Sequence, residues 1–380
     1  YAMLQDKSPI QRSLTCADVG IDIAELRESL SRNIGFPLRH YHDPDVFELE
    51  LGRIFEGAWQ FFVPLAQVAN PGDVATGMVG RTPIIVARER DGKLHGMVNA
   101  CRHRGFRVVE EGQTECKRLF CRYHGWSYRL DGSLLRAPNT ESDPDFIPKD
   151  HGLCKISVGI WGQAVFVNTD PDALPLKEAM PELWELSEKL GFDESTDSYE
   201  LHDTYTKVHE ANWKLWTDNG VECYHCGTIH GQSFNQAFSV DVENGQQSPV
   251  IQMGPLLSSE FSTQSKPGSG LVATFYKSIL FFPGAHFVQQ DDLMVMGRMV
   301  PTGPESCKYT AYYMRPKGSN PEKTSAWVEL YNMTFNEDAE VVELQQINMR
   351  SPRAAPFRYV PAREETSILT NKMILDAIAE

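Results

Sequence analysis

The chain of 380 residues lacks the features that mark membrane proteins and nucleic-acid-binding proteins. It contains no run of about 18 uncharged apolar residues, which is the length that a membrane-spanning helix needs. Basic residues are few, because 36 Lys and Arg stand against 51 Asp and Glu and give a net charge of −15. Such a charge repels nucleic acid and anionic membrane surfaces, so we expect neither as a partner.

Two further absences concern the cellular compartment. The N-terminal residues show no basic segment followed by an apolar one, which is the pattern of a secretory signal. Cysteine is too sparse for a secreted scaffold held by disulfides, since such chains are short and cysteine-rich. We therefore expect a cytoplasmic protein whose thiols are free, some of them metal ligands. The eight cysteines are Cys16, Cys101, Cys116, Cys121, Cys154, Cys223, Cys226 and Cys307.

Motifs through which electrons could enter the chain are also missing. The sequence has no G-x-G-x-x-G that opens a helix after a strand, and no C-x4-C-x2-C of a plant-type ferredoxin. Redox chemistry in this chain would therefore need electrons from separate proteins.

Hydrophobic patterns divide the chain into successive parts. Residues 46–59 carry apolar residues at helical spacing. Short alternating strands follow from about 60 to 170, with hairpin signals at Asp91-Gly92 and Asp131-Gly132, which predicts a compact β domain. Beyond about 171, helical patterns surround apolar strand runs, which predicts an antiparallel sheet with helices packed on it. These helical patterns lie at 183–190, 211–231, 322–348 and 363–379.

Two short loops in the β domain pair cysteine with histidine. Cys101-x-His103 is followed, after seventeen residues, by Cys121-x2-His124. Facing one another, the loops would supply two thiolates and two imidazoles, a set that structural zinc also accepts. The glycine that follows each histidine motif, at 105 and 125, lets the backbone approach closely and point N–H groups at bridging sulfides.

CRHRG and CRYHGW at this spacing resemble the Rieske [2Fe–2S] signature. The resemblance implies that Cys101 and Cys121 hold the inner iron, and that His103 and His124 hold the outer iron. Imidazole in place of thiolate removes negative charge from the cluster and raises its potential, so it can accept electrons from a ferredoxin-type donor. This interpretation is favoured over zinc.

A second cluster of polar residues lies at 218–230, DNGVECYHCGTIH. The pair Cys223-x2-Cys226 could be redox-active or bind zinc, but with His225 between the cysteines we expect both to be packing residues. His225 and His230 are five residues apart, about 140° around a regular helix. Both can reach one metal only if the helix is distorted or ends there, for example at Gly227. The histidines outside the two motifs, including His209 and His286, are expected at the surface or with satisfied hydrogen bonds.

NWKLWTDNGVECYHCGTIH resembles the mononuclear-iron motif of Rieske non-haem iron oxygenases. In that family, two imidazoles and one carboxylate bind one face of Fe(II) and leave the other face open for O2 beside the substrate. The resemblance implies His225 and His230 as ligands. Its third ligand is an aspartate in E-D-x-x-h-h-E-x-x-Q, where h is apolar, which corresponds to Asp338 in FNEDAEVVELQQ. Glu337 and Glu340 are neighbouring alternatives for this ligand. The non-functional alternative is that Asp338 is an acid in the first turn of a helix, where Asp and Glu are favoured.

Two acids before His225 are catalytic candidates. Glu222 lies three residues before His225 and can accept a hydrogen bond from the free N–H of that ligand. The family resemblance implies that this acid also accepts a hydrogen bond from His124 of the partner subunit, so that electrons cross a subunit interface. Asp218 is the next candidate for this role. A solvent-facing helix acid is the structural alternative.

The resemblance covers about residues 40 to 350 and implies an α+β fold. A Rieske β-sandwich, residues 59–170, would be inserted in a helix-grip (START-like) catalytic domain formed by 1–58 and 171–380. Such subunits assemble as trimers, alone or with small β subunits, and receive electrons from a separate reductase, a ferredoxin or both. Residues 101–136 carry seven Arg and one Lys against three Glu and one Asp, so this rim could dock an acidic electron carrier or could be a solvated surface.

The sequence therefore predicts a terminal oxygenase that uses O2, a Rieske [2Fe–2S] cluster and a mononuclear non-haem Fe(II) on a small organic substrate. Of the possible reactions, hydroxylation of an aromatic ring is slightly favoured. Oxidative N-demethylation or cleavage of a quaternary amine is the alternative, because ECYHC resembles relatives with that activity, whereas INMRSP after QQ departs from them. A Rieske or zinc module without oxygen chemistry is the remote alternative.

Overall fold

The computed structural model describes residues 14–112, 114–193, 195–239, 250–258, 264–266, 271 and 276–379. Its N-terminal helices are α1 (Ile23–Ser31), α2 (Pro44–Glu50) and a π-helical turn, η2 (Leu51–Phe55), that continues α2. The predicted helix at 46–59 is thus confirmed for most of its length. No helix among the described residues is long and apolar enough to cross a membrane.

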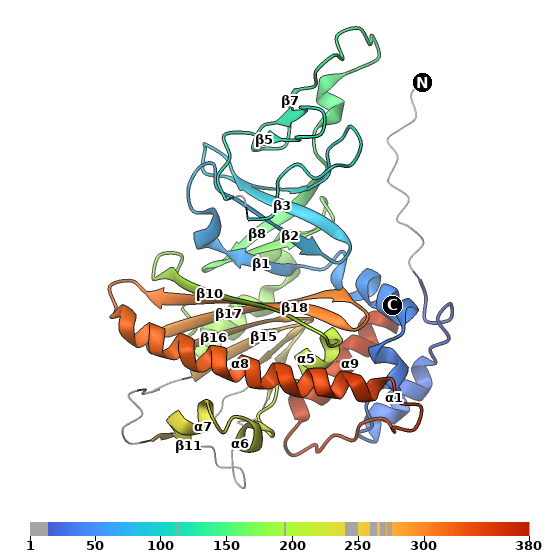
Figure 1. The fold of residues 1–380 in the computed structure, drawn as a ribbon, viewed down its shortest axis with the longest axis vertical. Coiled ribbons are helices and arrows are strands. Elements are labelled where there is room, and N and C mark those ends of the chain that lie inside the picture. The colour runs from blue at the N-terminus through green and yellow to red at the C-terminus, as the bar shows by residue number, and fades with distance from the viewer. Residues whose placement is uncertain are drawn as a thin grey trace.

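A six-stranded antiparallel sheet follows the N-terminal helices, and with three short strands it forms what we call the small β unit (Figure 1). Asp91-Gly92 joins two neighbouring strands of the six, and Asp131-Gly132 joins two of the three, so both predicted hairpins are confirmed. Both glycines have positive φ, which these tight turns require. The six strands, in spatial order, are β1 (Gln60–Pro64), β9 (Ala164–Asn168), β8 (Lys155–Trp161), β4 (Leu94–Val98), β3 (Thr82–Arg88) and β2 (Val74–Val79); the three are β5 (Leu119–Phe120), β6 (Ser127–Tyr128) and β7 (Leu134–Arg136).

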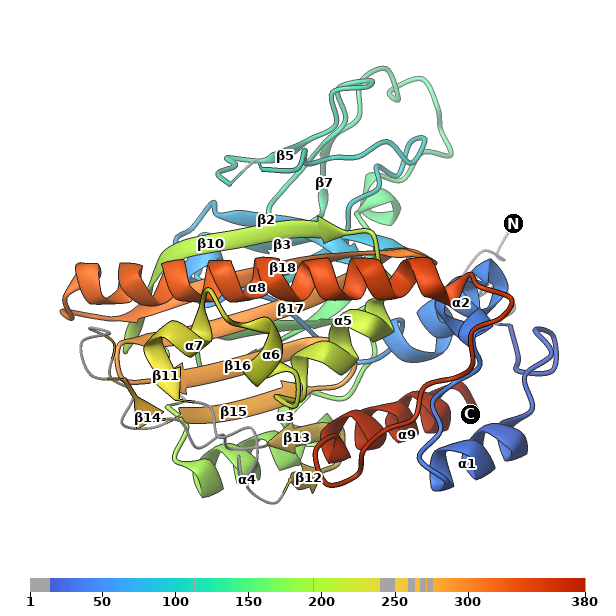
Figure 2. The same ribbon diagram turned by 60° about the horizontal axis from the view of Figure 1, so that its bottom comes forward.

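The second part of the chain is built on a seven-stranded antiparallel sheet, here called the large sheet. Its long helix α8 (Pro321–Met349) runs across one face, and the small β unit lies on the other side (Figures 1 and 2). The predicted α+β architecture, with an antiparallel sheet and helices packed on it, is confirmed. The strands, in spatial order, are β10 (Tyr199–His209), β18 (Ser306–Pro316), β17 (Leu293–Gly303), β16 (Ala285–Gln290), β15 (Tyr276–Phe281), β13 (Leu256–Ser258) and β12 (Ile251–Met253).

Side chains of the large sheet point alternately to its two faces, and each face belongs to a different hydrophobic core. On β18, Tyr309 and Tyr313 pack with residues of α8, whereas Tyr312 packs with Phe61 of the small β unit. Successive strand residues point to opposite faces. The strands of a sheet that is covered on both sides therefore have nearly continuous apolar sequences. The cavity described below therefore lies on the helix side of the sheet.

The N-terminal and C-terminal helices pack against each other beside the large sheet. Helix α9 (Glu365–Ala379) contacts α1, and an isolated bridge joins Ile34 to Arg358. Apolar residues of α1 and α2 belong to the same core as those of α8. The chain thus leaves this core after α2, forms the small β unit, and returns to it. The remaining helices include α3 (Leu176–Ala179), α4 (Pro181–Leu190), α5 (Trp213–Gly220), α6 (Cys226–Ile229) and α7 (Phe234–Ala237).

Candidate metal centres

The predicted helix over 211–231 is interrupted, and the interruption brings two histidines together. Helix α5 begins after Asn212, whose side chain accepts from the Lys214 N–H, and it ends at Gly220. The one-turn helix α6 has His225 as its N-terminal cap residue and His230 as its C-terminal cap residue. Their ring centroids are 5.1 Å apart. Two residues that would point about 140° apart on a regular helix therefore face one point.

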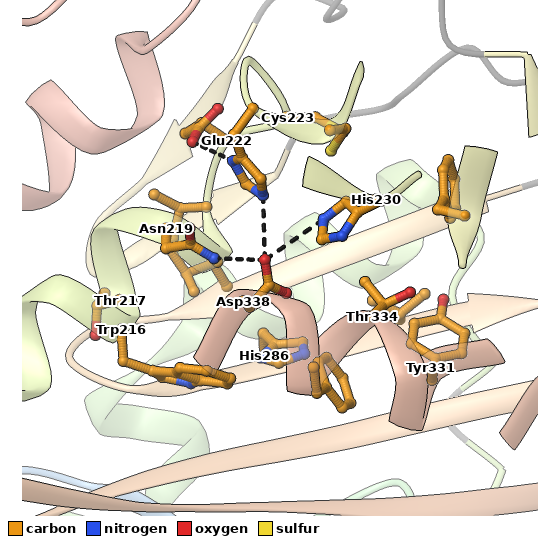
Figure 3. Close-up of a pocket in the computed structure, with 18 of the residues that line it drawn as sticks. Trp216, Thr217, Asn219, Glu222, Cys223, His230, His286, Tyr331, Thr334 and Asp338 are labelled. Carbon is orange, nitrogen blue, oxygen red and sulfur yellow. Dashed lines mark hydrogen bonds and ion pairs between the residues drawn. A yellow bond between two sulfur atoms is a disulfide. The ribbon is translucent and has the colours of Figure 1, made fainter. Parts of the chain in front are cut away.

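Asp338 on α8 completes a group of three converging side chains (Figure 3). Its Oδ1 lies 3.2 Å from His225 Nε2 and 3.4 Å from His230 Nε2. Asn219, at the end of α5, donates from Nδ2 to the same oxygen at 2.9 Å. Two imidazole nitrogens and one carboxylate oxygen around one point are the donor set of a mononuclear non-haem iron.

The outer nitrogens of both histidines face carboxylates. His225 Nδ1 lies 2.5 Å from Glu222 Oε1, and His230 Nδ1 lies 2.9 Å from Glu337 Oε2. An N–H donated outward leaves the inner Nε2 lone pair available for a metal, so the residues present fit such an ion. In the protein without metal, burial alone would lower the pKa of His225, but the hydrogen bonds to Asp338 and Glu222 raise it to about 10.

The three acids of FNEDAE occupy different places. Asp338 faces both histidines, whereas Glu337 faces only the outer edge of His230 and also accepts from Ser233 Oγ. Glu340 lies in a groove at the surface, together with Glu343 and Lys207. Sequence reasoning offered Glu337 only as an alternative ligand and missed its contact with His230.

Asp218 does not lie where the sequence suggested. Its carboxylate accepts hydrogen bonds from Tyr359 Oη at 2.9 Å and from Asn371 Nδ2 of α9 at 2.8 Å. Burial raises its pKa to about 7, against the effect of these hydrogen bonds. It is absent from the described lining of the cavity that contains Glu222 and Asp338. The structure thus places the Asp218 carboxylate against α9 and away from this cavity, and its catalytic role stays a prediction.

One expectation about cysteine is also corrected. The sulfurs of Cys223 and Cys226 form a disulfide with a Cα–Cα distance of 5.0 Å, although we expected free thiols. Cys226 lies close enough to both histidines to form a possible metal-binding group with them, but the disulfide leaves it no thiolate. Cys116 is buried in the core of the small β unit.

The loops of the small β unit bring together the other four predicted ligands. In each loop a glycine N–H donates to the cysteine carbonyl four residues before it, from Gly105 to Cys101 and from Gly125 to Cys121. Both glycines have positive φ, so the two loops turn in the same way. This shared geometry follows from the glycine in each motif.

Burial separates the sulfur ligands from the nitrogen ligands. Cys101 and Cys121 are 3% and 2% exposed, whereas His103 and His124 are exposed. The centroids of the two imidazole rings lie 4.5 Å apart, and the Trp126 ring stacks on His103 with a centroid distance of 5.2 Å. Buried thiols beneath two adjacent exposed imidazoles fit a cluster with an inner and an outer iron.

A hydroxyl group supports one of the cysteines. Tyr128 Oη lies 3.1 Å from Cys101 Sγ and accepts from the N–H of Arg102. Hydrogen bonds to cluster sulfurs tune the reduction potential of such centres. This contact could not be predicted from the sequence, because Tyr128 on β6 lies 27 residues after Cys101 in the chain.

A cavity of about 200 Å³ opens beside His225, His230 and Asp338. We call this cavity the pocket, and seven of its lining residues are Trp, Tyr or Phe. His286 lines it, which corrects the expectation of a surface or fully hydrogen-bonded histidine. His209 is also corrected: it is fully buried, and neither ring nitrogen has a hydrogen-bond partner within the described residues. The Trp, Tyr and Phe residues of the pocket wall are Trp216, Tyr224, Phe234, Tyr276, Tyr309, Tyr331 and Phe335.

Two family models match the chain. Residues 58–155 match the Rieske [2Fe-2S] domain, and residues 196–380 match the ring hydroxylating alpha subunit (catalytic domain). The first match contains the four predicted ligands of the small β unit, and the second contains His225, His230 and Asp338.

Several known proteins resemble the chain. It is 34% identical over 210 residues to the glycine betaine monooxygenase oxygenase subunit of Chromohalobacter salexigens, which covers 54% of this chain and 45% of that protein. It is 33% identical over 196 residues to the toluate 1,2-dioxygenase subunit alpha of Pseudomonas putida, covering 50% and 43%. These matches therefore span about half the length of the relatives.

A solved structure matches over nearly the whole chain. It is that of the quaternary ammonium Rieske monooxygenase CntA with an inhibitor, with a TM-score of 0.80 and 22% identity. The match covers 93% of this chain and 98% of that one. At this identity the likeness concerns the fold.

Proposed function

The chain belongs to the Rieske oxygenases whose catalytic domain is that of ring-hydroxylating alpha subunits, and from this premise we propose that it is the terminal oxygenase of a multicomponent system. Its cofactors are a Rieske [2Fe–2S] cluster and a mononuclear iron, with O2 as co-substrate. When bound, the two metal groups supply electron transfer and O2 activation. Electrons would come from a separate reductase or ferredoxin.

The proposed ligands follow the donor sets described above. Cys101 and Cys121 would hold the inner iron of the cluster, and His103 and His124 the outer iron. His225, His230 and Asp338 would hold the mononuclear iron; the convergence of their inner donor atoms supports this assignment. Glu222 and Glu337 orient the two imidazoles, and Asn219 holds the Asp338 carboxylate.

We propose that the substrate is a quaternary ammonium compound that is oxidised at an N-methyl or adjacent carbon. The aromatic wall of the pocket carries this proposal, because a quaternary ammonium group binds the faces of several aromatic rings. Burial raises the pKa values of Tyr309 and Tyr331 well above the ordinary value, so both remain neutral. Arg363 is the only Lys or Arg among the described lining residues. The betaine-oxidising relative gives further support.

Aromatic ring hydroxylation, which the sequence placed first, becomes the second candidate. The toluate dioxygenase relative favours it, and an aromatic pocket can also hold an aromatic substrate. The relatives named for glycine betaine and carnitine match over a larger share of this chain.

We also propose that electrons reach the mononuclear site from a second copy of the chain. The loops with His103 and His124 belong to the far end of the small β unit, whereas α6 lies on the opposite side of the large sheet (Figure 1). Glu222 would accept a hydrogen bond from His124 of the partner subunit in a trimer. Its Oε1 already contacts His225 Nδ1, so it would connect the two centres.

The test is turnover with a surrogate reductase, O2 and a panel of substrates. We expect trimethylammonium compounds to yield oxidised amine, with formaldehyde where a methyl group is lost. Hydroxylated products from aromatic acids, without turnover of any quaternary amine, would favour the second candidate. Zinc alone after purification, without iron or acid-labile sulfide, would contradict an oxygenase of either kind.

A further inference from the structure

Three residues on adjacent strands form a unit on the pocket side of the large sheet. His286 on β16 is the direct cross-strand partner of Gly297 on β17, and Met299, two residues further along β17, pairs with Tyr309 on β18. Tyr309 Oη lies 3.2 Å from His286 Nε2, although one strand separates the two residues. The planes of their rings are nearly parallel, with an interplanar angle of 4°.

Glycine at position 297 permits this contact. A Cβ added there would lie 2.6 Å from Tyr309 Oη and 2.4 Å from His286 Cε1, distances at which one of the two rings must move. The tyrosine can therefore reach across β17 only because the middle strand carries no side chain at this point.

The contact determines which ring nitrogen of His286 carries the proton. Tyr309 is 1% exposed, and burial keeps its pKa well above the ordinary value, so its hydroxyl is protonated. A buried O–H without an acceptor is costly, and among the described residues His286 is its only hydrogen-bond partner. The hydroxyl therefore donates to Nε2, and the proton of the neutral imidazole resides on Nδ1.

His286, which lines the pocket, is left with a neutral donor at Nδ1. Within the described part of the chain this nitrogen has no hydrogen-bond partner, and it is not one of the fully enclosed polar atoms. Figure 3 shows His286 in the pocket, between Trp216 and Thr334 in this view and under Asp338. Burial lowers its pKa to about 4, so it adds no positive charge that would repel an ammonium group.

We propose that His286 is a specificity-determining residue whose Nδ1–H donates a hydrogen bond to an oxygen on the chain of the quaternary ammonium substrate. This inference rests on the proposed function and narrows its substrate class to compounds that carry a hydroxyl or carboxylate oxygen. The aromatic wall binds the ammonium end, and His286 binds the oxygen. A compound without the oxygen would leave the donor unpaired in a largely apolar cavity.

The experiment measures binding to the iron-loaded protein by calorimetry, without turnover. The matched ligands are (2-hydroxyethyl)trimethylammonium and propyltrimethylammonium, which differ by a hydroxyl in place of a methyl group; carboxymethyltrimethylammonium is the third ligand. We expect wild type to bind the better of the two oxygen-bearing ligands about 3- to 10-fold more tightly than the propyl compound, the range that one net hydrogen bond gives. The better of the two identifies the oxygen group.

Four variants test the residue. His286→Leu should remove the preference, whereas His286→Asn should keep part of it, because the amide nitrogen of Asn lies near the position of Nδ1. Gly297→Ala keeps both polar groups but displaces them, so it should also lose the preference. His202→Leu is the matched control outside the pocket, where the ring contacts Ser325 on the outer side of α8. Circular dichroism and the cluster spectrum report whether each variant is folded.

The outcomes separate the two proposals. If wild type binds none of the three ligands, the proposed substrate class is wrong, and the inference falls with it. If wild type binds all three with equal affinity, or if folded His286→Leu keeps the preference, the role of His286 is wrong while the substrate class stands. If His286→Leu cannot be folded, the contrast between His286→Asn and Gly297→Ala decides, and equal preference in both contradicts the inference.

Discussion

The carboxylates beside the two histidines differ in position, and Glu222 is the one that we propose connects the two metal centres. Its Oε1 lies 2.5 Å from His225 Nδ1, and its side chain is 10% exposed. A carboxylate at this position can accept from a second donor outside the subunit. Replacing it with an amide keeps the shape and removes the charge.

We expect Glu222→Gln to retain both metals and the cluster spectrum but to slow turnover by at least about tenfold, the usual effect of losing a partner of a metal ligand. Single-turnover transfer from a pre-reduced cluster measures the step directly. Transfer at the wild-type rate would contradict the connecting role. Asp218 accepts from Asn371 of α9 and is absent from the described lining of the pocket, so we do not expect it to replace Glu222 in this role.

Glu337 and Glu340 provide a matched pair on one helix. Glu337 accepts from His230 Nδ1 at 2.9 Å, whereas Glu340 lies in a surface groove. We expect Glu337→Gln to weaken iron binding about 10- to 100-fold and Glu340→Gln to leave it unchanged. Competition with a chelator measures the affinity. Equal iron affinity in the two variants would show that Glu337 has no positioning role.

At the scale of the elements, the end of α5 at Gly220 decides the site. A continuous helix would separate His225 from His230, so the turn between α5 and α6 is as important as the ligands. Helix α5 is held on its other side by a buried ion pair, in which Lys214 Nζ lies 2.7 Å from Glu50 Oε1 of α2. Asp218 adds a contact with α9.

The Asp218 contact predicts a pH dependence of stability. Its pKa is raised from 3.8 to about 7 in the folded protein, chiefly by burial, so the folded state binds a proton more tightly than the unfolded state. This contribution to stability is fully present below about pH 4 and is lost as the pH rises through 7.

We therefore expect Asp218→Asn to gain stability relative to wild type between pH 5 and pH 8, by roughly a few degrees in Tm. The measurement is thermal unfolding of both proteins at matched ionic strength. A difference in Tm that stays constant over this range would mean that Asp218 ionises normally in the folded protein.

At the scale of the whole molecule, an acidic protein carries a basic rim around its exposed histidines. Arg104 and Arg118 lie over the rings of Tyr123 and Phe120, and all four side chains are exposed. The whole chain has a net charge of −15, so the positive charge of this rim differs in sign from that of the protein as a whole. An acidic electron carrier would be attracted to it over about a Debye length, roughly 10 Å at moderate salt.

Arg104→Glu and Arg118→Glu should each raise the concentration of an acidic carrier that is needed for half-maximal turnover, by about 3- to 10-fold at low salt. The effect should shrink as ionic strength rises. Lys189→Glu, an equal charge change on exposed α4, is the control. If all three variants behave alike, carrier docking does not use the rim. Unchanged cluster spectra would show that the ligand loops are intact.

The sequence by itself determined the parts of this protein that depend on neighbours along the chain. The two cysteine–histidine loops, the Asp-Gly hairpins and the long helix over 321–349 could all be predicted, because spacing and glycine positions fix local geometry. The order of helices and strands, and with it the α+β class, followed from the hydrophobic periods.

Only the tertiary structure decided which side chains meet across elements. Adjacent helix residues point about 100° apart, so Asp338 faces both histidines while Glu337 reaches only the outer edge of one. No local pattern fixes the rotation of α8 relative to α6. For the same reason Asp218 turned toward α9, and His286 met Tyr309 across a glycine on the strand between them. These contacts join segments far apart in the sequence, and packing rather than spacing sets them.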